Sequence, residues 1–256
     1  MSGGSLNIEP TIPVAVVNQS RKSDGEALQL VQALQTQVTR DLQPAWGAAA
    51  QIHFLGSKAE FPPHYWRLTL LDQRPQGEPR GEFGHHTLQK IDGQWLPVGY
   101  IYTAPAAAAW TRTASHELVE MLCNPYLCAA SYQHKRHEAL QLYSLEACDP
   151  CQTGAYTIDG VEVSNFVYPA FYSEHRPKPL DHMGHLEKPY FPQLGGIVSV
   201  YDSAQSAWVG RTPDPADPGR LMSLPGPEGD PFQNNGLTMF RTVGSEILPG
   251  PPQSSP

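Results

Sequence analysis

A short segment in the middle of the chain has the residue types and the spacing of a metal site: His116-Glu117-Leu118-Val119-Glu120. On a helix, residues four apart lie on one face about one turn from each other, so His116 and Glu120 can bind one Zn²⁺ through bonds of roughly 2.0–2.2 Å. Glu117 would then point toward the open coordination position, where it can take a proton from water and pass it to a leaving amine. This is the logic of the H-E-x-x-H helix, with Glu in place of the second His.

The same spacing has an ordinary explanation, because any helix with a polar face can place His and Glu one turn apart. Two neighbouring features favour the metal site. The small residues Thr113-Ala114-Ser115 lead directly into the motif. Two acids, Glu146 and Asp149, follow in a cysteine-bearing segment that is close enough in sequence to return to the metal.

Four blocks of the central region resemble a family of uncharacterised bacterial zincin-like proteins, which are of the zinc-metallopeptidase type. That family carries S-H-E-x-x-E-x-x-x-[DN]-P, then E-x-C-D, then Y-x-I-D-G-V-x-V-S-[DN]-F. The corresponding segments of this chain are 115–120, Asn124-Pro125, 146–149 and 156–166. A more distant likeness is to secreted proteins in which H-E-x-x-E is followed by E-I-x-D-x-C.

The likeness extends over most of residues 12–202 and is most specific in its middle third. It includes Trp46-Gly47, the block Gly84-His85-His86 and the pair Gly195-Gly196. The chain departs from the family in the upstream block, where a common form is Gly-Tyr-His-Asp and this chain has Gly84-His85-His86-Thr87. His86 keeps its place there, but the acid that follows it is lost. The segment 126–145 is also long and unusual, so the path from the motif helix to Glu146 is not defined by the likeness.

The resemblance implies a zinc site in which His116 and Glu120 are ligands and Glu117 is the general base. The third ligand would be Glu146 or Asp149, which are three residues apart and would share a face on a helical turn. One of them could bind the metal while the other orients a ligand. The expected cofactor is therefore Zn²⁺, and the expected partner is a peptide or protein substrate.

Several other histidines and tyrosines have weaker claims to a role. His86 could act on a substrate as an electrophile, but an ordinary histidine is favoured because this residue type serves in many settings. The segment 134–138 is favoured as a solvated face and the pair His182 and His185 as part of a surface loop. A tyrosine hydroxyl could stabilise an oxyanion, although a structural aromatic is favoured for each candidate; these are Tyr156, Tyr168 and Tyr172.

The four cysteines all lie between Cys123 and Cys151, which is not the pattern of a small disulfide-rich protein. Free thiols are favoured, ahead of a structural zinc site or a local disulfide. A redox pair formed by Cys148 and Cys151 comes last, because no βαβ pattern of the thioredoxin type surrounds it.

The elements that must position the motif can be predicted from hydrophobic periodicity. A capping box at Ser23 and Glu26 begins an amphipathic helix over residues 24–42. The motif itself lies on a second helix over 109–123, which Asn124-Pro125 ends. A hairpin is expected over 156–168, with Asp159-Gly160 at its turn. Strands are expected at 12–18, 51–55, 67–72, 98–103 and 195–201.

This order of elements predicts an α/β fold of the zincin-like type, in which a mixed sheet packs on the motif-bearing helix. The catalytic domain would span 12–211. From Thr212 onward Pro, Gly and polar residues dominate, so a loosely ordered, irregular C-terminal part is expected over 212–256, with a possible edge strand at 237–243.

Composition excludes several classes of function. Hydrophobic residues make up 40% of the chain and its net charge is -8, so it can bury a core but repels nucleic acid. No apolar stretch has membrane-spanning length, and Met1-Ser2-Gly3-Gly4-Ser5 lacks the features of a signal peptide. A cytoplasmic protein is therefore expected, with leaderless export as the alternative.

Two hypotheses about function follow. The first is a zinc-dependent peptidase or amide hydrolase. Because one His and two carboxylates form an anionic ligand set, its metal would be a weak Lewis acid, which predicts modest activity or a preference for another metal. The second is a non-catalytic metal-binding or protein-interaction module on the same scaffold, which would not need Glu117.

Overall fold

The first half of the chain forms a five-stranded sheet with the order β2-β1-β3-β5-β4. Four of the strands are parallel, and β4 alone runs antiparallel, paired with β5. The strands are β1 (Ile12–Gln19), β2 (Ala50–Phe54), β3 (Trp66–Leu71), β4 (Gly84–Ile91) and β5 (Gln94–Tyr102). The computed structural model describes residues 11–57, 61–74, 83–104, 110–133, 141–175, 178–202 and 206–224.

One long helical segment follows β1 and returns the chain to β2. Helix α1 (Asp24–Thr36) begins at the capping box of Ser23 and Glu26, as predicted. The predicted helix continues as a π-helix (Gln37–Leu42) and as α2 (Gln43–Trp46), and it ends at Gly47, which has a φ of 72°. A left-handed residue of this kind is a common helix terminator, and glycine adopts it without a steric cost.

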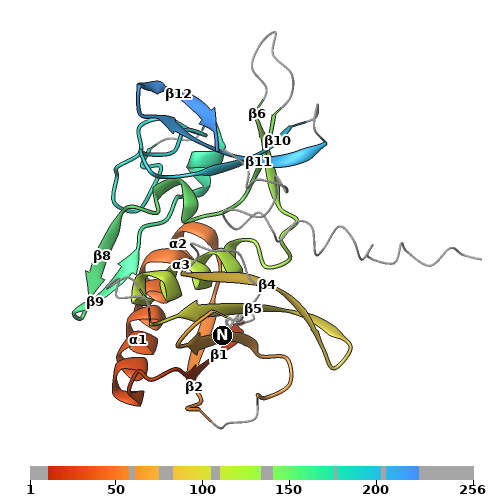
Figure 1. Ribbon diagram of the computed structural model, residues 1–256, viewed down its shortest axis with the longest axis vertical. Helices are drawn as coiled ribbons and strands as arrows, with labels where there is room; N and C mark the ends of the chain where they lie inside the picture. The colour runs from red at the N-terminus through yellow and green to blue at the C-terminus, as the bar shows by residue number, and fades with distance from the viewer. Residues whose placement is uncertain are drawn as a thin grey trace, which may run out of the picture.

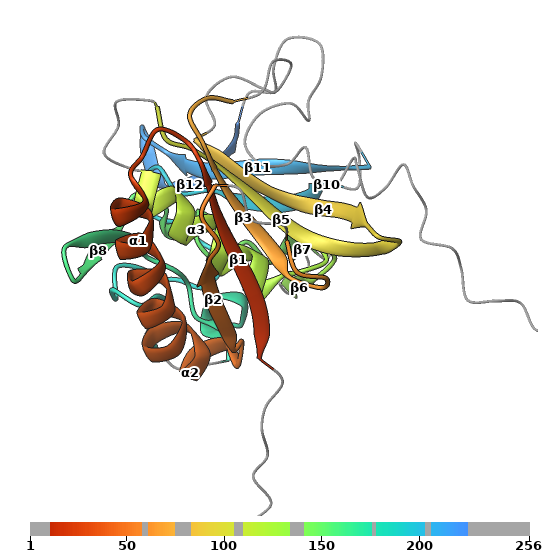
Figure 2. The same cartoon turned by 90° about the horizontal axis from the view of Figure 1, so that it is seen from below.

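The motif helix is α3 (Trp110–Cys123), which agrees with the prediction over the part that the structure describes. It lies on the side of the first sheet that faces the second half of the chain, and Figures 1 and 2 show it between the two. Its buried side chains Leu118 and Met121 join the main core with Leu68 and Ile101 of the sheet. The sheet therefore fixes the orientation of α3, and the remaining face of the helix can carry polar groups.

The second half of the chain forms another five-stranded sheet, with the order β12-β11-β10-β7-β6. Its described pairs are antiparallel. The strands are β6 (Ala130–Gln133), β7 (Gln141–Ser144), β10 (Val198–Asp202), β11 (Ala207–Asp214) and β12 (Asp217–Ser223). Two 3₁₀ helices, η2 (Asp149–Cys151) and η3 (Pro169–Tyr172), lie in the connection between β7 and β10. Figure 1 shows this sheet above the first one.

A separate hairpin, β8 (Ala155–Ile158) and β9 (Val161–Ser164), packs against both α1 and α3. Its turn is Asp159-Gly160, where both residues have positive φ, as expected for the predicted turn. The hairpin is shorter than predicted, because β9 ends at Ser164.

The fold is thus a mixed α/β architecture. The prediction of an irregular part from Thr212 onward is wrong for residues 212–214 of β11 and for 217–223, which form β12. The segment 237–243 lies outside the described residues. No helix in the described ranges combines the length and the apolar character that a membrane crossing requires.

Candidate metal centre

The polar face of α3 is held in place by buried hydrogen bonds just before the motif. The Ser115 hydroxyl donates to Gln37 Oε1 at 2.7 Å and accepts from the backbone N–H of Ser164 at 2.9 Å. The Gln37 amide in turn donates to the Ser164 carbonyl oxygen at 3.0 Å. The motif helix, the π-helix and strand β9 are therefore joined one residue before His116.

His116, Glu120 and Asp149 converge beside α3. His116 Nε2 lies 3.2 Å from Glu120 Oε2 and 3.3 Å from Asp149 Oδ1. Ligand atoms at roughly 2.0–2.2 Å from a tetrahedral Zn²⁺ are themselves separated by about 3.3–3.6 Å. The three side chains thus fit a zinc ion both in chemistry and in spacing. Glu120 is buried, whereas His116 and Asp149 are partly accessible, which leaves an approach from solvent.

Asp149 reaches this position through contacts made by its backbone. Glu120 Oε1 accepts hydrogen bonds from the backbone N–H groups of Cys148 (3.0 Å) and Asp149 (3.2 Å). On the other side, the Ile197 N–H donates to the Asp149 carbonyl oxygen at 3.0 Å. One oxygen of Glu120 therefore holds the segment that supplies Asp149, and the other oxygen faces His116.

His86 lies in the same cluster of side chains. It lies on β4, is only 2% exposed, and its Nδ1 is 2.8 Å from Glu117 Oε2. The same nitrogen is 3.8 Å from Glu120 Oε2. The one sequence signal for this position is that His86 keeps its place in the Gly-x-His block. Its partner could not be read from the sequence, because β4 and α3 are separate elements.

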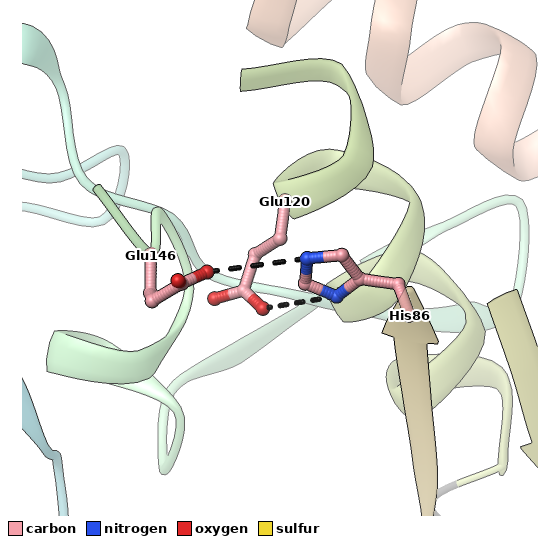
Figure 3. Close-up of side chains that lie close together, drawn as sticks. All are labelled: His86, Glu120 and Glu146. Carbon is pink, nitrogen blue, oxygen red and sulfur yellow. Dashed lines mark ion pairs between the residues drawn. The ribbon is translucent and has the colours of Figure 1, made fainter. Parts of the chain in front are cut away.

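Glu146 contacts His86 rather than His116. Glu146 Oε2 lies 4.0 Å from His86 Nε2, and neither atom has a hydrogen-bond partner among the described residues. Figure 3 shows the Glu146 and Glu120 carboxylates on the same side of the His86 ring, each facing one of its two nitrogens. The two acids between which the sequence left a choice therefore lie in two groups: Asp149 with His116 and Glu120, and Glu146 with His86 and Glu120.

The electrostatics of the cluster favour added positive charge. Burial opposes the imidazolium of His86, but its hydrogen bond to Glu117 and the surrounding carboxylates outweigh burial and raise its pKa to about 9. For His116, burial is likewise outweighed by the charge of Glu120 and the hydrogen bond to Asp149, so that its pKa is well above the usual value. The carboxylates around both histidines therefore stabilise a positive charge on the imidazole rings.

The pKa values of the three acids in the cluster are shifted in different directions. Burial and then the charge of Glu120 raise the pKa of Glu146 to about 8 and that of Asp149 to about 6. Burial also opposes ionisation of Glu120, but the charge and hydrogen bond of His116 outweigh it and lower its pKa. Excess negative charge in a buried place is the condition under which a metal ion can replace bound protons.

The remaining candidates lie elsewhere or have other partners. The Tyr156 hydroxyl donates to Asp41 Oδ2, and that of Tyr172 donates to the Glu146 backbone oxygen. Tyr168 pairs with His182, which is half-buried and stacked on Phe166 instead of lying in an exposed loop. His185 is exposed, as expected. The segment 134–138 lies outside the described residues.

The four cysteines are free thiols, as the sequence favoured. Burial raises the pKa of Cys123, Cys148 and Cys151 well above the ordinary value, so these thiols stay protonated. Within the described ranges, the groups of side chains close enough to share a metal ion contain no cysteine.

Comparison of this chain with models of protein families, with curated proteins and with solved structures finds no match.

Proposed function

We propose that this protein is a zinc-dependent hydrolase of peptide or amide bonds on a zincin-like scaffold. The observation that carries the proposal is the position of His116 Nε2, which lies 3.2 Å from Glu120 Oε2 and 3.3 Å from Asp149 Oδ1. These residues would hold the ion, with Asp149 as the third ligand. Zn²⁺ bound there supplies a Lewis acid that lowers the pKa of water and polarises a carbonyl oxygen.

Glu117 is the proposed general base. It follows His116 on α3, and one carboxylate oxygen is fixed by His86 at 2.8 Å. Glu117 would take a proton from the attacking water and deliver it to the leaving amine, so that the water oxygen forms the new bond to the carbonyl carbon as the C–N bond breaks. His86 is a positioning residue, because its ring holds the carboxylate at the metal side of the helix.

The position of β4 supports a peptide as the substrate. It is the last strand in the order of the first sheet, and no further strand pairs with it among the described residues. An extended peptide can add to such an edge through backbone hydrogen bonds. His86 belongs to this strand and reaches the cluster, so a peptide bound along β4 would pass close to Glu117.

The ligand set predicts a weak Lewis acid. One imidazole and two carboxylates are more anionic than a set of three histidines, and oxygen-rich sites also suit Mn²⁺. We therefore expect modest turnover with Zn²⁺ and a measurable response to replacement by another divalent metal.

The hydrogen bond between Glu117 and His86 also favours a second candidate, a non-catalytic metal-binding module. In such a module Glu117 would only orient His86, and its charge would serve the structure. Hydrolysis of a denatured protein mixture by wild type, Glu117→Gln and chelator-treated protein separates the two candidates. Activity that falls in both altered samples supports the hydrolase, whereas equal signals in all three samples would remove it.

A further inference from the structure

We propose a second divalent-cation site beside the first, formed by His86 Nε2, Glu146 Oε2 and the shared carboxylate of Glu120. The proposal deepens the proposed function, because it makes the centre a two-metal site in which Glu120 bridges the ions. The ligand atoms of these three residues lie within 4.8 Å of one another.

Two buried polar atoms face each other at this site without a partner. His86 Nε2 and Glu146 Oε2 are 4.0 Å apart, and neither makes a hydrogen bond to any described residue. This separation is too long for a direct hydrogen bond. It exceeds the separation of about 3.3–3.6 Å between two ligand atoms of a tetrahedral zinc ion, so the two side chains would approach each other by about half an ångström to share one ion. Figure 3 shows the two atoms directed at each other, with the Glu120 carboxylate alongside.

The surroundings of His86 prepare its Nε2 as a ligand. Its Nδ1 is bonded to Glu117 Oε2 at 2.8 Å, so an N–H at that position donates to the carboxylate. The proton is then absent from Nε2 in the neutral ring, and the lone pair points toward Glu146. Histidines that bind metals commonly donate their other N–H to a carboxylate in this way.

In the Glu146 and Glu120 carboxylates, one oxygen is likewise held by hydrogen bonds and the other is left for an ion. The Ser144 hydroxyl donates to Glu146 Oε1 at 2.9 Å, and Tyr172 holds the Glu146 backbone oxygen at 2.8 Å, which leaves Oε2 for a ligand. Glu120 Oε1 accepts two backbone N–H groups, and Oε2 lies near both histidines. Oε2 is 3.2 Å from His116 Nε2 and 3.8 Å from His86 Nδ1, and Glu120 is the acid that belongs to both groups.

Equilibrium dialysis of the full chain against buffered Zn²⁺, followed by elemental analysis, tests the proposal. We expect two ions per wild-type chain and one in Glu146→Gln, which keeps the shape of the side chain. His116→Gln should also retain one ion. Glu187→Gln is a matched control, because Glu187 is exposed; it should bind two.

The outcomes separate this inference from the proposed function. One ion in wild type, lost in His116→Gln and unaffected by Glu146→Gln, would overturn the second site and leave the first intact. No ion in wild type would overturn both. Titration of wild type with Co²⁺ needs no variant, and a single phase of visible absorbance ending at one equivalent would also overturn the second site.

Discussion

His86 Nδ1 and Glu117 Oε2 are joined by a 2.8 Å hydrogen bond, although the two residues are separated by 31 positions and lie on different elements. The bond links the edge strand β4 to the motif helix. It fixes one oxygen of Glu117 and leaves the other to receive a proton. The geometry therefore connects the edge that would bind a peptide to the residue that would act on it.

Replacing Glu117 by Gln tests its role as a base. The amide keeps the shape of the side chain but cannot accept the proton, so we expect kcat to fall by roughly 10²–10⁴-fold. Zinc content should be unchanged, because Glu117 is not a proposed ligand. Steady-state hydrolysis and elemental analysis of the same preparation give both values. Loss of the metal together with the activity would show instead that Glu117 holds the ion.

His116→Ala should abolish binding of the ion at the first site. It removes the only imidazole of that site, so we expect an affinity loss larger than the roughly 10–100-fold produced by groups that merely orient ligands. Competition with a zinc-binding dye measures the affinity. His185→Ala is the control, since His185 is exposed and lies outside both groups. Equal affinities in the two variants would contradict the site.

Gly196→Ala should disturb the metal site from a distance. A Cβ at Gly196 would overlap the carbonyl oxygen of Pro150, the residue that follows Asp149. The segment must shift to relieve the overlap, and we expect a zinc affinity about 10–100-fold lower. Gly25→Ala is a fitting control, because its Cβ would meet only Ser23 Oγ at 3.8 Å. Unchanged affinity in Gly196→Ala would mean that Pro150 moves without Asp149.

Ser115→Ala should destabilise the fold. The substitution leaves Gln37 Oε1 and the Ser164 N–H without their buried partner, which costs about 1–3 kcal/mol. Urea denaturation measures the free energy of unfolding, and Ser57→Ala at an exposed position provides the comparison. A difference below about 0.5 kcal/mol, as for surface substitutions, would show that other groups take over these hydrogen bonds.

The chelator-treated protein should lose stability as pH rises from about 6.5 to about 9. The pKa of His86 is raised from 6.5 to about 9, so its contribution is complete below 6.5 and is lost as pH passes 9. The pKa of Glu146 is raised from 4.5 to about 8, which adds a change of the same sign. Urea midpoints across this range provide the measurement. Midpoints that increase with pH would contradict the assigned environments.

The elements that could be predicted from the sequence are those with a strong local signal. The capping box at Ser23 marks the start of α1, and the proline after Asn124 marks the end of α3. The turn at Asp159-Gly160 marks the hairpin. In the second sheet the sequence predicted one strand, at 195–201, which overlaps β10, and the other strands lack such signals. Pro213 suggests a loop, yet it lies in β11 at an irregularity of the pairing with β12, which is one of the places where a strand tolerates proline.

The arrangement of the candidate site could be predicted only for the residues that lie on one helix. The four-residue spacing of His116 and Glu120 determines their common face. The assignment of Asp149 to one group and Glu146 to the other depends on backbone hydrogen bonds to Glu120 and on the packing of η2 against Gly196. The position of His86 depends on the register of β4, in which it pairs with Gly99. Such long-range contacts leave no local pattern in the sequence.

The hydrogen bonds from the backbone N–H groups of Cys148 and Asp149 to Glu120 have a consequence for how the proposed site would take up an ion. These bonds involve only protein atoms, so the side chains that we propose as ligands are positioned by the folded chain itself. The entropic cost of ordering these side chains is then part of folding and not of metal binding. A zinc finger differs, because there the ion itself drives folding. A site of this kind would release and rebind an ion without unfolding, and an ion bound there in a cell would reflect which metals the surroundings supply.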